Sequence, residues 1–234
     1  SFLKEHLRLS RGEILRLKAR EDGILLDGVR VTVRAVLHRG QTLRLSADDR
    51  AEDGGSPIAP VALPLSILYE DEDICLCNKS GNMPTHPSHG HFDDTLANAV
   101  ARYERLTRGQ AGIFRPINRL DRDTSGCMLT SNTRDASYKM YLAMTNGEIQ
   151  KSYIAVIDGI PPADEGVLES HMHRKPDSII MREETSPDAP DAKPAVTTYR
   201  VLAKTATHSI VLASPITGRT HQIRVHTKHI GHPV

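Results

Sequence analysis

Asp121 is the residue whose surroundings best suit acid–base or nucleophilic chemistry. It lies in the segment 118–126, which reads NRLDRDTSG, between Arg119 and Arg122. Two guanidinium groups favour an ionised carboxyl, and the Thr-Ser-Gly turn can hold the backbone rigidly. An ionised carboxylate in a fixed position is what a nucleophile or a base requires. A charged surface turn would have the same composition, so the segment alone leaves both interpretations open.

Two other segments combine polar and apolar side chains in a dense pattern. Tyr153 opens an apolar run in the segment 151–159, KSYIAVIDG, which has the composition of a strand ending in a turn. Residues 217–226 read TGRTHQIRVH, and IGHP follows at 230–233. A single tyrosine in a strand usually packs in the core, so Tyr153 by itself does not indicate a catalytic role.

The twelve histidines and three cysteines raise the question of a metal site. His86, His89 and His91 share a loop rich in Gly, Ser and Pro, and His171 and His173 form a second group. Zinc sites favour defined Cys and His spacings, and the sequence has no Cys-x-x-Cys pair. We therefore predict no bound metal, and we interpret these histidines as loop polarity or as contacts with phosphate groups.

Composition and charge restrict the class of protein. Hydrophobic residues make up 38% of the chain, and no apolar run reaches the roughly 18 residues that a membrane-spanning helix needs. We therefore predict a soluble, cytoplasmic protein. The net charge is only +1, but basic residues gather towards the two ends of the chain. Two basic ends could bind a polyanion at two places. Basic faces are, however, often only solvated surface.

Residues 1–47 have the pattern of a small module with the order helix, helix, hairpin, strand. Ser10 and Glu13 have the spacing of a capping box, so a helix is expected to begin there and to bury Ile14 and Leu17. Asp-Gly at 27–28, between apolar runs, predicts a hairpin, and an alternating strand follows. Residues 48–64 are rich in Asp, Gly, Ala and Pro and are predicted to be a linker.

The remaining residues, 65–234, mix strands and helices. The patterns predict a hairpin at 67–77, helices at 95–106 and 133–146, and strands at 149–157, 197–202 and 209–213. Residues 161–194 hold many Pro, Asp and Ser residues and are predicted to form irregular, exposed connections. Because there is no regular βαβ alternation, we predict an α+β domain built on a mixed, largely antiparallel sheet flanked by helices.

The three dense segments together resemble the RluA-type pseudouridine synthases. The family has a central motif His-Arg-Leu-Asp-(Arg/Lys)-x-Thr-Ser-Gly and a Lys-x-Tyr strand motif, and residues 217–226 match its third. The resemblance implies isomerisation of uridine within RNA, without a cofactor, and makes Asp121 the catalytic carboxylate. It implies that Tyr153 lies against the target uracil and that Arg224 pairs with Asp121. Ile223 would form an apolar wall beside the base.

The same resemblance assigns Arg119 to the space left when the target nucleotide leaves its helix, and Arg219 and His221 to RNA binding. Asn118 stands where the family usually has His. Asparagine keeps a hydrogen-bonding side chain, so we expect altered support of the loop and not loss of activity. Family members usually continue for several dozen residues past Gly-His-Pro, so we expect a further C-terminal part after Val234.

Residues 1–47 resemble the alpha-L type RNA-binding domain. The match rests on Phe2-Leu3, Leu9-Ser10-Arg11, Leu17-Lys18, the segment 23–28, and Leu37, Gly40 and Leu43. The resemblance implies RNA contacts by basic side chains of the helical part, and we assign these to Arg8, Arg11 and Lys18. It favours ribosomal RNA over transfer RNA as the partner, and we expect the protein to be a monomer.

Three alternatives remain. The chain could be a non-catalytic RNA-binding or ribosome-assembly protein on the same fold, although it retains Asp121, Tyr153 and Arg224 together. It could be a synthase directed to transfer RNA. A metal-dependent hydrolase that uses the histidine loop would lack a ligand set.

Overall fold

The computed structural model describes residues 2–7, 9, 11–46, 58–109, 113–175, 178 and 181–234. By its internal contacts the chain divides into two compact units, residues 1–142 and 143–234. The predicted boundaries at residues 47 and 64 stay a prediction, because residues 47–57 lie outside the described ranges.

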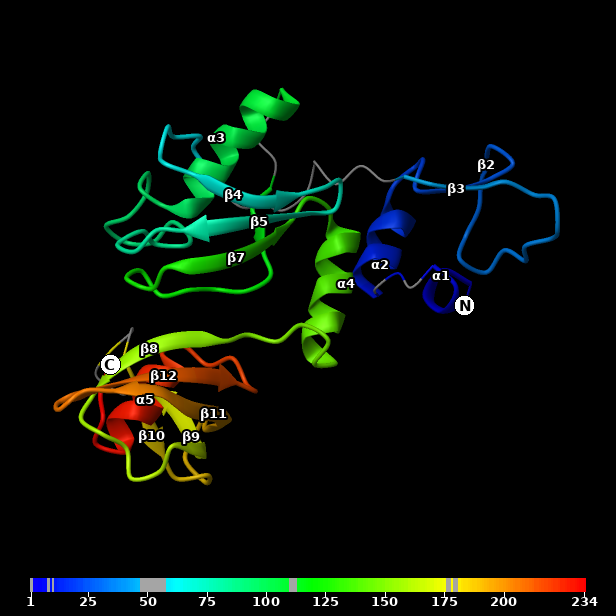
Figure 1. Ribbon diagram of the computed structural model, residues 1–234. Coiled ribbons are helices and arrows are strands. Elements are labelled where there is room, and N and C mark those ends of the chain that lie inside the picture. The colour runs from blue at the N-terminus through cyan, green and yellow to red at the C-terminus, as the bar shows by residue number, and fades with distance from the viewer. Residues whose placement is uncertain are drawn as a thin grey trace. The chain divides into compact units, whose positions relative to one another are not determined.

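The N-terminal segment contains two helices and a three-stranded antiparallel sheet in the order β2-β1-β3 (Figure 1). Its elements are α1 (Phe2–Glu5), α2 (Arg11–Ala19), β1 (Ile24–Leu26), β2 (Val29–Arg30) and β3 (Leu43–Leu45). Leu3, Leu17 and Ile24 are buried together and form its core, with Ile14 packed against them. This is the predicted order of helix, helix, hairpin and strand. The identity of the segment as an alpha-L type domain stays a prediction.

The hairpin between β1 and β2 follows from its two turn residues. Asp27 has φ 52° and Gly28 has φ 83°. Both lie in the left-handed region, as a two-residue hairpin turn of type I′ requires. Leu26 pairs with Val29 across the turn, as the Asp-Gly signal predicts. The predicted capping box of α2 cannot be described in the same way, because Ser10 lies outside the described residues.

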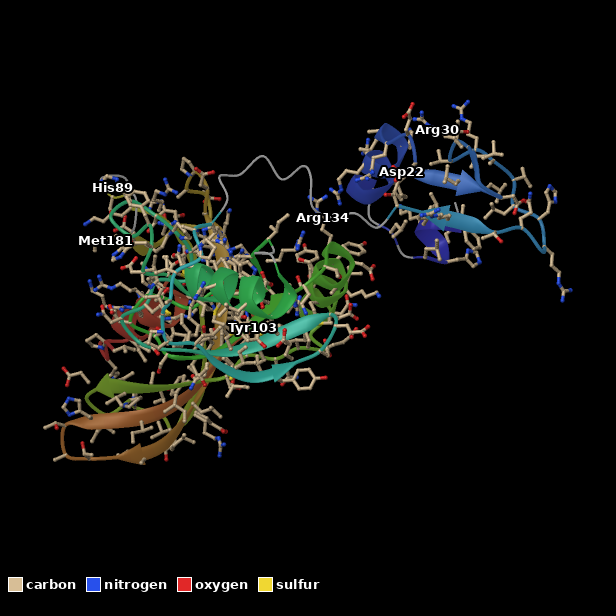
Figure 2. The ribbon with its side chains drawn as sticks, turned by 90° about the horizontal axis from the view of Figure 1, so that it is seen from above. Asp22, Arg30, His89, Tyr103, Arg134 and Met181 are labelled. Atoms are coloured by element: carbon tan, nitrogen blue, oxygen red, sulfur yellow. The ribbon has the colours of Figure 1, made fainter. Side chains whose placement is uncertain are left out.

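The first unit also contains a four-stranded antiparallel sheet in the order β4-β5-β7-β6. Its elements are β4 (Ser66–Glu70), β5 (Ile74–Lys79), α3 (Leu96–Arg108), β6 (Arg115–Pro116), β7 (Gly126–Ser131) and α4 (Arg134–Thr145). Helix α3 lies over the strands in both views (Figures 1 and 2). Tyr103 of α3, labelled in Figure 2, donates a hydrogen bond to Glu70 of β4 at 2.5 Å, which ties helix to sheet.

The second unit is a five-stranded antiparallel sheet in the order β10-β9-β11-β12-β8, with one helix packed on β9 to β12. Its elements are β8 (Tyr153–Asp158), β9 (Glu165–Arg174), β10 (Arg182–Thr185), β11 (Lys193–Lys204), β12 (His208–Pro215) and α5 (Gln222–His229). Ile157, Val211 and Ala213 are buried in the sheet.

The prediction of irregular connections at 161–194 is wrong. This segment contributes β9 and β10, and β9 pairs with β11 from Glu165 to Met172. The inward positions of β9 include Gly166, Ser170 and Met172, so the sequence lacks the apolar alternation by which a strand is usually recognised. Pairing with β11 satisfies the backbone of β9 and determines its conformation.

The predicted α+β fold class is confirmed. All strand pairings within the described ranges are antiparallel, and they form separate sheets. Among the same residues there is no helix whose length and apolar content would let it cross a membrane.

Candidate active site

Asp121 lies in the loop that connects β6 to β7. Leu120 beside it is buried, which anchors the loop, and Asp121 itself is half-buried. The amide of Thr124 donates to the carbonyl oxygen of Asp121 at 3.1 Å and closes a turn. Gly126 then enters β7 with φ 122°, a conformation that side-chain-bearing residues rarely adopt. The Thr-Ser-Gly turn therefore holds the backbone around Asp121 as the sequence predicts.

Lys79, the last residue of β5, holds this loop from inside the unit. Its side chain is 0% exposed. Nζ donates to the carbonyl oxygens of Ser80 at 2.8 Å, Met83 at 2.7 Å and Arg122 at 2.9 Å. An ammonium group has three donors, so each has a carbonyl acceptor. The bond to Arg122 fixes the residue that follows Asp121 to a strand 43 positions earlier in the chain.

The charge of Lys79 also acts on the acidic side chains of the loop. Burial lowers the pKa of the Lys79 ammonium, and the carboxylates of Asp123 and Asp121 partly oppose that shift by attraction. Arg122 forms an exposed ion pair with Asp123, with Nε 3.2 Å from Oδ1. Lys79 is therefore a buried cation that stabilises the loop, and it was not among the site residues predicted from the sequence.

A second backbone segment runs beside the loop and restrains it further. The amide of Met83 donates to the carbonyl oxygen of Arg122 at 3.1 Å. The hydroxyl of Thr85 donates to the carbonyl oxygen of Leu120 at 2.9 Å. Both neighbours of Asp121 are therefore bound through their carbonyl groups. The loop is consequently held on each side of the carboxylate by groups in the interior of the unit.

Tyr153 and the third motif lie in the second unit. Tyr153 is the first residue of β8, is half-buried, and pairs with Ala213 of β12. Helix α5 carries Ile223 and Arg224 in its first turn. Arg224 is exposed, and Ile223 is half-buried beside a small apolar cavity between α5 and the sheet. Since Asp121 belongs to the first unit, its pairing with Arg224 stays a prediction.

Gln222 anchors the start of α5. Its side chain is buried, and Nε2 donates to the carbonyl oxygen of Val196 and to the hydroxyl of Thr197, both at 2.9 Å. Oε1 accepts from the hydroxyl of Thr217 at 2.8 Å and from the amide of Arg219 at 2.9 Å. All four hydrogen-bonding positions of the amide are therefore used.

His226 anchors the next turn of α5. It is 1% exposed, with Nδ1 2.9 Å from the hydroxyl of Thr197 and Nε2 3.1 Å from the hydroxyl of Ser170. Burial lowers its pKa, and the nearby His229 adds to the shift. The neutral ring therefore joins α5 to two strands. Together with the contacts of Gln222, this fixes the helical turn that presents Arg224.

The other predicted RNA contacts are distributed over both units. Arg11 and Lys18 are exposed on α2, and Arg8 lies outside the described residues. Arg219 uses Nε to donate to the carbonyl oxygen of Pro194 at 2.9 Å, and His221 precedes α5 with φ 58°. Their roles in RNA binding stay predictions.

The two histidine groups, in the loop 86–91 and in strand β9, do not bring metal ligands together in the described residues. No group of three or more His, Cys, Asp or Glu side chains there is arranged to hold a metal ion. His91 contacts Asp94 at 2.6 Å, and His173 contacts Glu183 at 3.2 Å. Each is a pair of one histidine and one acid, which is too few ligands for a metal site.

Comparison with known proteins gives one consistent result. The model of the RNA pseudouridylate synthase family matches residues 73–229, which include Lys79, Asp121, Tyr153 and α5. An uncharacterized RNA pseudouridine synthase of Bacillus subtilis is 34% identical over 228 residues, covering 97% of this chain and 78% of its own length. Ribosomal large subunit pseudouridine synthase D of Pseudomonas aeruginosa is 34% identical over 217 residues, covering 92% of this chain and 64% of its own length.

Solved structures agree with the sequence relatives. The human protein described as RNA pseudouridylate synthase domain containing 1 has a TM-score of 0.59 and 26% identity, covering 73% of this chain and 67% of its own. Several curated relatives are considerably longer than the part that matches, and the chain spans 53% of one from Synechocystis and 54% of one from Blochmanniella floridana.

Proposed function

Because the chain belongs to the RNA pseudouridylate synthase family, we propose that it is an isomerase that converts uridine within RNA to pseudouridine, with Asp121 as its catalytic carboxylate. The observation that carries the proposal is the fixation of the Asp121 loop. Lys79 binds it through Arg122, and Thr85 binds it through Leu120, within the region that the family model matches. Such fixation positions a carboxylate before substrate arrives, and so lowers the entropic cost of reaching the transition state.

The reaction itself explains which groups are needed. The bond between N1 of uracil and C1′ of ribose breaks, the base turns, and a bond from C5 to C1′ forms. The hydrogen on C5 leaves to solvent, and N1 gains one, so the composition of the nucleotide is unchanged. No electron is transferred and no group leaves, and therefore the chemistry requires no cofactor. The carboxylate of Asp121 is the group we assign to bond cleavage.

A base inside an RNA helix must first be turned outward, at a cost of a few kcal/mol for unstacking. We assign Arg119, which is exposed in the same loop as Asp121, to the vacated place. Tyr153 would lie against the uracil with Ile223 beside it, and Arg224 would pair with Asp121. Arg219 and His221, which precede α5, are assigned to the RNA backbone.

Ribosomal RNA is the substrate class we propose. Exposed Arg11 and Lys18 on α2 supply positive charge for phosphate contacts. Relatives that carry the name ribosomal large subunit pseudouridine synthase include those of Pseudomonas aeruginosa and Vibrio cholerae. The proposal includes a monomeric protein that acts in the cytoplasm.

Pseudouridine mapping tests both the activity and the substrate class. Ribosomal and transfer RNA from cells lacking the protein would be compared with RNA from the parent strain. We expect at least one pseudouridine to disappear from ribosomal RNA and to return on incubation with the purified protein. Loss confined to transfer RNA would redirect the substrate assignment. Unchanged maps in both RNAs would favour the non-catalytic RNA-binding alternative.

A further inference from the structure

Asn118 closes the loop that carries Asp121. The backbone ladder between β6 and β7 pairs Arg115 with Ser131 and Pro116 with Thr130. One further backbone bond follows, in which the amide of Ile117 donates to the carbonyl oxygen of Leu129 at 2.8 Å. At the next residue, Asn118, the hydrogen bonds to β7 are made by the side chain instead of the backbone.

The amide of Asn118 makes two hydrogen bonds across the base of the loop. Nδ2 donates to the carbonyl oxygen of Cys127 at 3.1 Å, and Oδ1 accepts from the backbone amide of Leu129 at 2.8 Å. If the amide were turned over, Nδ2 would face the N–H of Leu129 and Oδ1 would face the carbonyl oxygen of Cys127. The hydrogen-bond partners therefore determine the orientation of the amide. Residues 119–126, with Asp121 among them, are enclosed by these two bonds.

The position requires one donor and one acceptor on the same short side chain. Asparagine supplies both, and aspartate supplies only acceptors when it is ionised. A neutral histidine ring also carries one donor and one acceptor, whereas a protonated ring carries two donors. In that ring only Nδ1 could replace an atom of the amide, because the carbon Cδ2 takes the place of the other, so histidine could make one of the two bonds and asparagine makes both.

We propose that Asn118 is a positioning residue whose side-chain amide holds the Asp121 loop in its active geometry. The proposal rests on the assignment of Asp121 as the catalytic carboxylate. Asn118 acts through the backbone of Cys127 and Leu129, so its replacement should alter the rate of the chemical step more than the affinity for RNA.

The first test is Asn118→Asp, assayed with RNA that carries tritium at C5 of uracil. The variant keeps the size of the side chain and its acceptor but faces the carbonyl oxygen of Cys127 with a second oxygen. We expect kcat to fall by about tenfold or more, as the loss of one hydrogen bond with an unsatisfied acceptor implies, with KM nearly unchanged. The matched control is Asn146→Asp, the same change at an exposed residue outside the loop, which should leave kcat unchanged.

The second test is Asn118→His, which keeps the proposal falsifiable if Asn118→Asp does not fold. Through Nδ1 the ring can make only one of the two bonds that Asn118 makes, so kcat at pH 8 should fall by about two- to tenfold, with KM nearly unchanged.

The outcomes separate this proposal from the assignment of function. If Asp121→Asn is inactive while Asn118→Asp matches wild type in kcat, the positioning role is wrong and the function stands. A kcat for Asn118→His at pH 8 equal to that of wild type would also overturn the role. If Asp121→Asn retains activity, the proposed function itself fails, whatever the Asn118 variants do.

Discussion

Replacing Lys79 with methionine would remove a buried ammonium and keep most of the volume of its side chain. Three carbonyl groups would lose their N–H donor, those of Ser80, Met83 and Arg122. The Arg122 carbonyl would still accept from the amide of Met83 at 3.1 Å, so the carbonyls of Ser80 and Met83 are the two whose donor is not replaced by that bond. A buried acceptor without a partner costs about 1–3 kcal/mol.

Met83 is buried, whereas Ser80 is exposed and its carbonyl oxygen can accept from water. The loss is therefore about 1–3 kcal/mol, and removing the desolvated charge offsets part of it. We expect Lys79→Met to lower the free energy of unfolding by about 1–2 kcal/mol. It should lower kcat as well, because Arg122, next to Asp121, loses one of the two hydrogen bonds to its carbonyl oxygen. Denaturant unfolding measures the first effect as a lower midpoint at a constant m value, and tritium release from C5-labelled RNA measures the second.

Lys139→Met is the matched control. Lys139 is an exposed lysine on α4 of the same unit, paired with Asp135 one helical turn earlier at 2.5 Å. Such surface pairs contribute about 0.3–0.5 kcal/mol, so the control should stay within about 0.5 kcal/mol of wild type. If Lys79→Met unfolds at the same denaturant concentration as Lys139→Met and keeps normal kcat, the account of the loop is refuted.

Three other predictions follow from the remaining contacts. Burial lowers the pKa of His226, so the unfolded chain binds that proton more readily; the stability it contributes is full above about pH 6.5 and is lost as pH falls through the folded pKa. Thermal unfolding between pH 8 and 5.5 should show this loss, and a slope as steep in His226→Gln would contradict it. Replacing Arg11 and Lys18 with alanine should reduce the salt dependence of RNA binding by about 0.7–0.9 per phosphate contact, measured as log Kd against log salt. Activity should survive exhaustive chelation, and loss with chelator followed by recovery with zinc would revive the hydrolase alternative.

Local signals in the sequence predicted most of the elements. Asp27 and Gly28 predicted a hairpin because two left-handed residues are a strict local requirement, and both φ values are positive. The helix predicted to begin at Thr95 begins at Leu96. Thr95 is its N-cap, and its side chain accepts from the amide of Asn98. These features depend on neighbouring residues only, and so they can be recognised without the rest of the fold.

Features that depend on distant partners were predicted less well. Strand β9 follows from pairing with β11, about thirty positions later, which composition does not reveal. Lys79 had a usable signal, because Cys75, Cys77 and Lys79 alternate along β5 and all three are buried. A period of two places them on one face of the strand. Lysine is seldom buried without partners, and one of its three acceptors here, the carbonyl oxygen of Arg122, lies 43 positions later in the chain, so its burial was not predicted.

In the candidate site the structure describes how single residues are held, and the roles predicted for them stay predictions. Asp121 lies in a fixed turn, and Arg224 lies on a helix anchored by Gln222 and His226. The anchors themselves were not predicted, because a buried amide or imidazole can be identified only when its partners are known. The pairing of Asp121 with Arg224 stays a prediction.

The central claim is that the carboxylate of Asp121 isomerises uridine in RNA. Tritium release from ribosomal RNA labelled at C5 of uracil should be measured for wild type, Asp121→Asn and Asp123→Asn, together with the Kd for the same RNA. We predict release by wild type and by Asp123→Asn, and none by Asp121→Asn, with Kd unchanged in that variant. Release by Asp121→Asn at the wild-type rate would contradict the account.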